Sequence, residues 1–321
     1  MLGHIVIPRH LRDRIRPNVR LLTLKRILVA TDLTETSDAA LLSAGRLATA
    51  AGAALHVVHV TRDREAPISH TGRSWKYARE IEHGMRRAGV ARCPWHNHIF
   101  SGNAPYAIAS LADRISADVI VLGRHAEGQL PTPRPVGGTA YAVITGSDVP
   151  CLAVMRPLAV PASRMLVTID HSEAARGAVV AAVSWASGLR SRDFAAAAPT
   201  LIVLHVASTG AMQGAPASRS VDDELDRIRR VAGAWGGVVV EGVTVAGDDP
   251  ATGIAAYARE HEIQLLVLGT RGLSVDESTK LGSVSAAVTS MLEIPVLLVP
   301  PAVWRNYAAD LHPSKPGAIA E

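Results

Sequence analysis

The sequence predicts an α/β protein that consists of two tandem five-stranded parallel sheets. Short apolar runs alternate with longer segments whose apolar residues recur at helical spacing, which is the pattern of parallel strands joined by right-handed crossover helices. Apolar residues make up 48% of the chain and aromatic residues only 4%, which indicates aliphatic cores and favours an α/β fold over a β-sandwich. The same order of elements occurs twice in 321 residues, a length that accommodates two domains.

The first copy begins where an Arg-rich segment gives way to a short apolar run. In its first helix Ala44, Leu47 and Ala48 fall on one apolar stripe. The first strand ends in Asp32 and the fourth ends in Gly123. We expect strands at residues 27–30, 55–60, 93–100, 118–123 and 151–155, and helices at residues 37–51, 73–88, 105–115 and 139–145.

The second copy repeats this order. Its third helix has a clear start, because Ser220 and Asp223 resemble a capping box and Val221, Leu225 and Ile228 share one face. We expect strands at residues 164–170, 201–206, 238–245, 265–269 and 294–299, and helices at residues 174–189, 220–235, 251–261 and 283–292.

Three landmarks recur at nearly constant offsets, which indicates an internal duplication. Asp32 matches Asp170, Gly123 matches Gly269 and Pro150 matches Pro295, at offsets of 138, 146 and 145 residues. We therefore divide the chain into a basic arm (1–25), a first domain (26–156), a linker (157–163), a second domain (164–301) and a C-terminal tail (302–321).

Charge and cysteine content limit the classes of function. Residues 1–26 carry seven basic side chains and one acidic one, a net charge of +6, so the remaining residues sum to 4 − 6 = −2 and offer no basic surface for nucleic acid. No apolar run is long enough to span a membrane. Two cysteines are too few for a disulfide framework, so we expect a reducing, cytoplasmic location.

The segment from Leu265 to Ser283 predicts a phosphate site. Gly269 ends a buried strand, Gly272 lies in the following loop, and Gly282 precedes the helix that starts at Ser283. Such a helix directs free N–H groups and its positive dipole end at one point, which favours an anion. The pattern is neither the P-loop nor the dinucleotide fingerprint, and two ordinary turns would also produce it.

Asp170 is expected to face the same cleft. In the strand order 3-2-1-4-5 the first and fourth strands are neighbours at the point where the order reverses, and ligands bind beyond the carboxyl ends of the strands there. Asp170 would then accept hydrogen bonds from a base or a ribose. It could equally cap the helix that follows it, and the two roles are compatible.

These features resemble the universal stress protein family in tandem form, over residues 26–156 and 164–300. The specific part is the signature G-x-x-G, nine residues, G-[ST], which Gly269, Gly272, Gly282 and Ser283 match. The resemblance implies a Rossmann-like (adenine nucleotide alpha hydrolase-like) fold and ATP, with Mg²⁺, as a regulatory ligand. It also implies dimer-like pairing of the fifth strands, either in a homodimer or within one duplicated chain, so monomer and dimer both stay open. The implied ATP-binding residues are Thr168, Ile169, Asp170, Val206, Gly269, Thr270, Arg271, Gly272, Gly282, Ser283 and Val284.

The first copy departs from this signature. Ala126 replaces the second glycine, three prolines lie in the loop, and Gly138 and Thr139 come late, so we expect a degenerate or altered site. Arg124, His125 and Arg134 could still supply cations to an anion held in another way. The residues of this degenerate site are Asp32, Gly123, Arg124, His125, Gly138 and Thr139.

Catalytic and metal sites are less strongly indicated. Cys93, His96 and His98 are a weak metal candidate that would need a further ligand such as His56 or His59, so we expect no metal site. No catalytic residue is predicted, because His171 lacks a partner nucleophile and no G-x-S-x-G motif occurs. Two alternatives stay open: a nucleotide-independent protein-interaction module and a slow ATPase.

Overall fold

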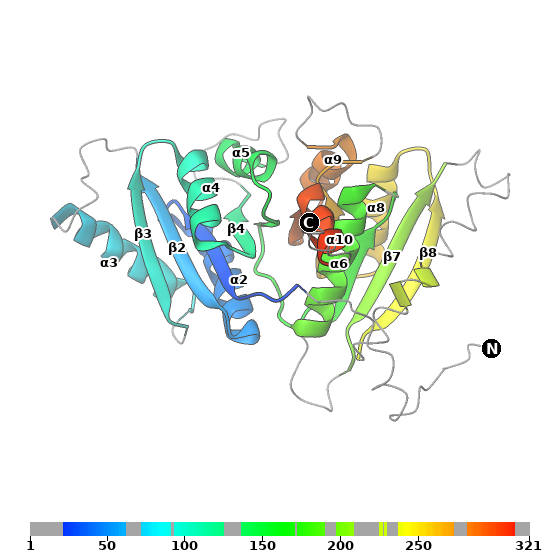
Figure 1. Ribbon diagram of the computed structural model, residues 1–321, viewed down its shortest axis with the longest axis horizontal. Helices are drawn as coiled ribbons and strands as arrows, with labels where there is room; N and C mark the ends of the chain where they lie inside the picture. The colour runs from blue at the N-terminus through cyan, green and yellow to red at the C-terminus, as the bar shows by residue number, and fades with distance from the viewer. Residues whose placement is uncertain are drawn as a thin grey trace, which may run out of the picture.

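The computed structural model describes residues 22–61, 72–90, 93–124, 136–170, 172–189, 197–208, 225–226, 228–229, 237–272 and 281–311. Their strands form one ten-stranded sheet in the order β3-β2-β1-β4-β5-β10-β9-β6-β7-β8 (Figure 1). Each half has the predicted order 3-2-1-4-5, and all strand pairs within a half are parallel.

The elements match the expected ranges closely. The first half contains β1 (Arg26–Thr31), α2 (Asp38–Ala51), β2 (Ala54–Thr61), α3 (Gly72–Arg87), β3 (Trp95–Ser101), α4 (Ala104–Ile115), β4 (Val119–Gly123), α5 (Gly138–Gly146) and β5 (Cys151–Val154). The second contains β6 (Arg164–Thr168), α6 (Glu173–Gly188), β7 (Thr200–Ala207), β8 (Val239–Ala246), α8 (Pro250–Glu260), β9 (Leu265–Gly269), α9 (Ser283–Met291), β10 (Val296–Val299) and α10 (Pro301–Leu311).

The helix expected at residues 220–235 lies mostly outside the described residues. Within it, residues 225–226 and 228–229 are helical, and Leu225 and Ile228 are buried as the predicted apolar face requires.

Helices cover both faces of the sheet (Figure 1). One core packs α2, α3, α6 and α10 on the sheet, and the other packs α4, α5, α8 and α9 on the opposite face. The central strands are buried on both sides, which explains why β5 and β10 are continuous apolar runs. This arrangement leaves the carboxyl ends of the strands as the edge at which polar loops gather.

The two halves join through their fifth strands. β5 and β10 pair antiparallel, with Leu152 opposite Leu297. This pairing takes place within one chain, so these strand edges are already occupied and leave no free ladder for the homodimer contact that the family resemblance implies.

Side-chain hydrogen bonds hold the connecting segments in place. Leu158, in the predicted linker, is buried, and its N–H donates to Ser43 Oγ at 2.9 Å while its carbonyl accepts from Arg46 Nη1 at 2.8 Å. Leu22, in the predicted arm, donates its N–H to Ser184 Oγ of α6 at 3.0 Å. The described end of the arm is thus attached to the second half.

Residues 302–311 are helical, whereas the sequence analysis places them in a tail. Pro301 starts α10, a position where proline lacks only an N–H that the first turn would leave unpaired. Val303 is buried, and a Cβ atom on Gly177 of α6 would lie 3.2 Å from the Trp304 nitrogen. The proline pair at residues 300–301 therefore begins a packed helix instead of ending the domain.

Candidate functional site

The loop after β6 is organised by Asp170. Its Oδ1 atom accepts hydrogen bonds from Ser172 N at 3.0 Å and Ser172 Oγ at 2.6 Å. Ser172 Oγ in turn accepts from Ala175 N at 3.1 Å and caps α6. The capping role considered for Asp170 therefore belongs to Ser172, and Asp170 holds the cap in position.

The glycine loop after β9 converges on this carboxylate. A Cβ atom on Gly272 would lie 2.9 Å from Asp170 Oδ2. Ser172 Oγ also lies 3.3 Å from the Arg271 carbonyl oxygen. Asp170 and the glycine loop thus lie at one point on the sheet edge, as the strand order predicts.

A close contact with the start of α6 requires a glycine at position 269. A Cβ atom there would lie 2.8 Å from the Ala174 carbonyl carbon, at the start of α6. The Gly269 carbonyl accepts from Ser285 Oγ at 2.6 Å, which ties the strand end to the first turn of α9. Close approach of backbones therefore explains this glycine, which does not have a left-handed backbone.

The start of α9 faces the same region with uncapped N–H groups. Gly282 is the N-cap residue and has no side chain to accept from them. Its own N–H donates to the Thr270 carbonyl at 2.7 Å, so the loop closes directly onto the helix. Ser283 is exposed. The helix dipole and these N–H groups together favour an anion at this position.

The end of β7 completes the edge. His205 Nδ1 donates to the Ile169 carbonyl at 3.2 Å and links β7 to the segment that carries Asp170. Val206 lies beneath the start of α8, since a Cβ atom on Gly253 would be 3.5 Å from its Cγ1. All predicted ATP-binding residues lie at the carboxyl ends of β6, β7 and β9, in the loops that follow them or at the start of α9. They are Thr168, Ile169, Asp170, Val206, Gly269, Thr270, Arg271, Gly272, Gly282, Ser283 and Val284.

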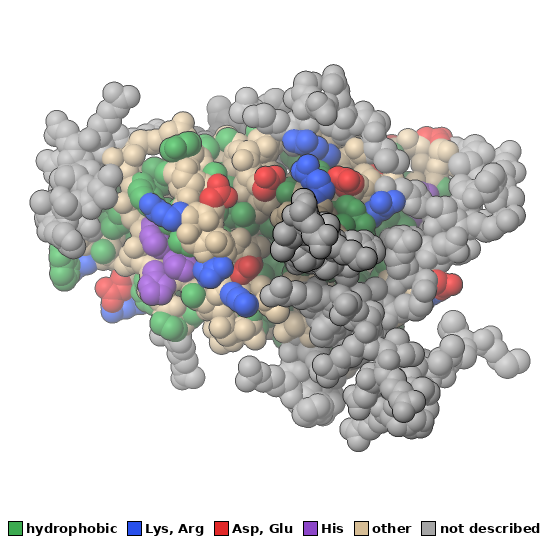
Figure 2. Space-filling model, viewed as in Figure 1, with side chains coloured by type: hydrophobic (Ala, Val, Ile, Leu, Met, Phe, Trp, Pro, Cys, Tyr) green, Lys and Arg blue, Asp and Glu red, His purple; other side chains and the backbone are tan. Residues whose placement is uncertain are grey.

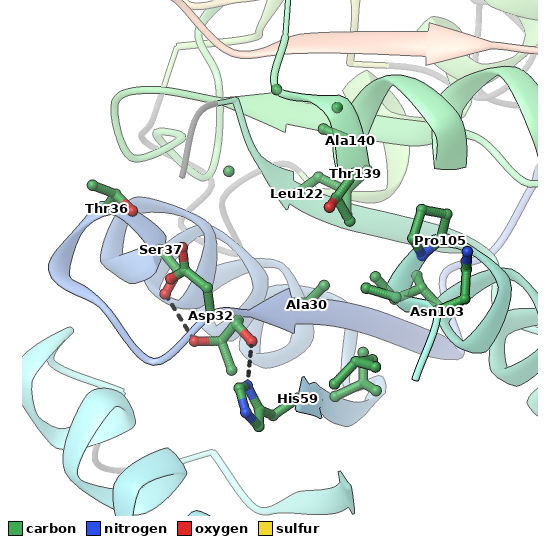
Figure 3. A pocket seen from close by; sticks show the side chains of 18 of the residues that line it. Ala30, Asp32, Thr36, Ser37, His59, Asn103, Pro105, Leu122, Thr139 and Ala140 are labelled. Atoms are coloured by element: carbon green, nitrogen blue, oxygen red, sulfur yellow. Dashed lines mark hydrogen bonds between the residues drawn. The ribbon is translucent and has the colours of Figure 1, made fainter. Parts of the chain in front are cut away.

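The first half has a cleft of about 710 Å³ at the corresponding edge (Figure 3). The predicted residues Asp32, Gly123, Arg124, Gly138 and Thr139 all line it. In Figure 3, Asp32 and His59 lie on one side and Thr139 and Ala140 on the other. His125, also predicted, and His171 of the second half lie outside the described residues.

Two histidines that were not predicted as site residues occupy equivalent positions in the two halves. His59 Nδ1 donates to the Thr31 carbonyl at 3.0 Å, as His205 donates to Ile169 in the second half. Their offset of 146 residues equals that of the two strand-ending glycines, so alignment of the repeats would have found them. Asn103 was also missed, and its side chain caps α4 at the cleft by accepting from Tyr106 N at 3.0 Å.

The guanidinium group of Arg124 contacts the second half of the chain. Its Nη1 donates to the Leu292 carbonyl at the end of α9 and to Met155 Sδ. Burial lowers the pKa of Arg124 to about 10, and nearby Glu293 partly opposes this. Nε and Nη2 have no hydrogen-bond partner among the described residues. This side chain therefore joins the two halves, a role the sequence analysis did not anticipate.

The weak metal candidate is divided between two faces of the sheet. Cys93 is buried in the core beneath α2 and α3, and its Sγ lies 3.6 Å from the Pro94 carbonyl. His96 and His98 alternate with core-facing Trp95 and Ile99, so they point to the other face. The described residues include no group of three or more His, Cys, Asp and Glu side chains that could hold a metal ion.

The described helices also include none that is long and apolar enough to cross a membrane. Both cysteines, Cys93 and Cys151, are buried free thiols, and burial raises the pKa of Cys151 to about 12.

A model of the universal stress protein family matches the chain twice, over residues 23–155 and 162–300. The chain belongs to the universal stress protein family. It contains two universal stress protein domains in tandem, in agreement with the internal duplication.

Solved structures show the same fold. A universal stress protein from Archaeoglobus fulgidus is 20% identical with a TM-score of 0.63, and the match covers 87% of this chain and 97% of that one. A functionally unknown protein from Pseudomonas aeruginosa is 16% identical with a TM-score of 0.59, covering 91% of this chain and 99% of that one. No curated protein matches the sequence. The tandem universal stress protein architecture thus extends over nearly the whole chain.

Proposed function

We propose that this universal stress protein binds ATP in its second domain (164–301), with Mg²⁺ accompanying the phosphates, and that the nucleotide regulates a cytoplasmic stress response. The observation that carries the proposal is the convergence of Asp170, Gly272 and the uncapped start of α9 on one edge of the sheet. These groups derive from three separate elements. A nucleotide needs a polar acceptor for its hydroxyl and amine groups, room beside the backbone, and a site for its phosphates. Asp170, Gly272 and the start of α9 supply these in turn.

Each part of ATP has a partner of suitable chemistry. Asp170 Oδ2 and the main chain near Val206 suit the hydroxyl and amine donors of the adenosine end. The backbone at Gly272 and the N–H groups after Gly282 suit the phosphates, and Ser283 can add a hydroxyl. Mg²⁺ prefers oxygen ligands and retains waters, so it would be held mainly by the phosphates.

The first domain (26–156) is proposed to have an altered site. Its cleft retains Asp32 and the start of α5, but Arg124 directs its guanidinium to the other domain. Residues 157–163 would serve as the linker.

Related proteins are consistent with this proposal. Solved universal stress proteins in complex with cAMP and with dAMP resemble this chain over 41% and 40% of its length. Their TM-scores are 0.33 and 0.32, so the proposal rests on residues of this chain.

A regulatory ligand fits this site better than a substrate that is rapidly hydrolysed. The described site contains Asp170, which is engaged with Ser172, and His205, which is engaged with Ile169. We therefore assign no catalytic residue. Phosphate release by the wild type above that of a Gly272 variant would instead support the slow ATPase.

Mass spectrometry of the small molecules released from freshly purified, denatured protein tests the proposal. ATP or another adenine nucleotide should be released from the wild type and from a Gly188→Ala control, where a Cβ atom meets nothing within 4 Å. It should be lost from Gly272→Ala. If no nucleotide is released and added ATP does not bind, the nucleotide-independent interaction module is favoured.

A further inference from the structure

The cleft at the strand ends of the first half has the size and lining of a small-molecule site, although the glycine loop beside it is altered. Its volume of about 710 Å³ falls within the range of roughly 300–1,000 Å³ that is typical of such sites. Apolar Val60, Ile108 and Leu122 line it together with the polar side chains of Asp32 and His59 (Figure 3). The proposed ATP site of the second domain does not use this cleft.

The aspartate of the first cleft is held in the same way as its counterpart in the second domain. Asp32 Oδ1 accepts hydrogen bonds from Thr34 N at 3.1 Å and Thr34 Oγ1 at 2.7 Å, as Asp170 Oδ1 accepts from Ser172 N and Oγ. Asp32 is exposed, and its Oδ2 has no hydrogen-bond partner among the described residues. This oxygen is therefore available to a hydroxyl or amine donor of a ligand.

The end of β2 also corresponds to the end of β7. His59 and His205 each contact the carbonyl oxygen of the residue that precedes the aspartate, at 3.0 Å and 3.2 Å. Val60 follows His59 as Val206 follows His205, and Val60 lines the cleft. The groups proposed to hold the adenosine end of ATP in the second domain thus recur in the first.

The end of the cleft at α5 differs from its counterpart at α9. Gly137 N–H donates to the Arg124 carbonyl at 2.5 Å, and Gly282 N–H makes the equivalent bond in the second half at 2.7 Å. The starts of α5 and α9 therefore align, which places Gly138 where the second half has Ser283. The first cleft thus loses, at this position, the hydroxyl group that is proposed to contact the phosphates.

The charge of the cleft opposes a phosphate chain. Acidic and basic side chains are interspersed on the face shown in Figure 2, so the charge within the cleft matters most to a ligand. Apart from His59, the ionisable residues among the described lining ones are Asp32 and Arg124. Arg124 is 2% exposed, and its Nη1 donates to the Leu292 carbonyl and Met155 Sδ instead of facing the cleft. The Asp32 carboxylate would repel a phosphate chain, and the partial positive charge at the start of α5 offsets this only in part.

We propose that the first cleft binds an adenine nucleoside without a phosphate chain, such as adenosine. The inference rests on the proposed function, because the residues that match in the two halves are those assigned to the adenosine end of ATP in the second domain. Asp32 would accept hydrogen bonds from the hydroxyl or amine groups of the nucleoside, and Val60 and Ile108 would contact its base. One chain would then bind ATP and an uncharged nucleoside in separate clefts.

Calorimetric titration of the full chain carrying Gly272→Ala, which closes the second site, tests this proposal. Adenosine should bind at one site per chain, and ATP at least about tenfold more weakly. Adding Asp32→Asn should lower the adenosine affinity about tenfold or more, because it removes a charged acceptor. Adding Asp170→Asn, the equivalent change in the second domain, is the matched control and should leave the adenosine affinity unchanged. The proposal is overturned if adenosine does not bind, if both substitutions act equally, or if ATP binds as tightly as adenosine.

Thermal unfolding of the wild type gives a second readout that does not depend on how Gly272→Ala folds. With ATP at saturation, adenosine should raise the Tm further, because it occupies a separate cleft. If adenosine added nothing at saturating ATP, the first cleft would not be its site. The proposed ATP site fails separately, since a Tm that does not respond to ATP alone would contradict it, while Asp32→Asn would still report on adenosine in the first cleft.

Discussion

Asp170 Oδ2 lies 2.9 Å from the position that a Cβ atom on Gly272 would occupy. The two residues are 102 positions apart in the chain and meet because β6 and β9 are neighbours in the sheet. Any side chain at residue 272 would therefore collide with a carboxylate that is already fixed by Ser172 through its other oxygen.

Replacing the Asp170 carboxylate should weaken nucleotide binding. Asp170→Asn retains the shape but removes a charged acceptor, and a hydrogen bond to a charged group contributes about 1.5–3 kcal/mol. We expect ATP affinity to fall about tenfold or more in calorimetry. Asp32→Asn in the first domain is the matched control and should leave it unchanged. If Asp170→Asn and Asp32→Asn lowered the ATP affinity equally, the ATP site would not be confined to the second domain.

The two strand-ending glycines should differ in their tolerance of alanine. A Cβ atom on Gly269 would lie 2.8 Å from backbone carbon of α6, whereas one on Gly123 would lie 3.4 Å from the Thr36 carbonyl oxygen. Gly269→Ala should lower the free energy of unfolding by about 1–3 kcal/mol in urea titrations, and Gly123→Ala by less. If Gly123→Ala lowered the free energy of unfolding more than Gly269→Ala, the contact of residue 269 with α6 would not be the tighter one.

Arg124 should be replaceable by an apolar side chain of similar length. Two of its three guanidinium nitrogens lack hydrogen-bond partners among the described residues, and replacement of such buried charges by well-packed apolar groups is often neutral or stabilising. Arg124→Met is expected to unfold at or above the wild-type temperature, whereas Arg124→Ala leaves a cavity between the halves and should unfold at a lower one. Equal destabilisation by both would show that the charge is required.

The contact of His98 with His56, on which His96 also stacks, predicts an acid-sensitive stability. Because the pKa of His98 is lowered to about 4 in the folded protein, the unfolded chain binds the proton more readily between about pH 6.5 and pH 4. The free energy of unfolding should therefore fall as the pH falls through this window. Because the ring is only half-buried, the slope should stay below the one-proton limit of about 1.4 kcal/mol per pH unit.

Urea titrations at several pH values in metal-free buffer measure this slope. His98→Gln should flatten it, while His83→Gln should not. An unchanged slope in His98→Gln would mean that His98 titrates normally.

Periodicity and duplication predicted the fold well, because parallel strands buried on both faces are continuous apolar runs bounded by turn residues. Residues 302–311 were placed in a tail because Pro313, Pro316 and Gly317 follow them, and only the packing of Val303 and Trp304 on α6 shows a helix. The convergence of Asp170 with the glycine loop followed from strand order. The contact of Arg124 with Leu292 did not, because it depends on how β5 and β10 pair, which no local pattern encodes.

The central claim is an ATP site at Asp170 and Gly272. Its most direct test is the ATP-dependent rise in melting temperature of Gly272→Ala beside the wild type, with Gly188→Ala as control. At a hundredfold excess over Kd, ATP should stabilise the wild type and the control by about 2.7 kcal/mol. It should leave Gly272→Ala nearly unshifted. A full ATP shift in Gly272→Ala, or none in the wild type, would contradict the account.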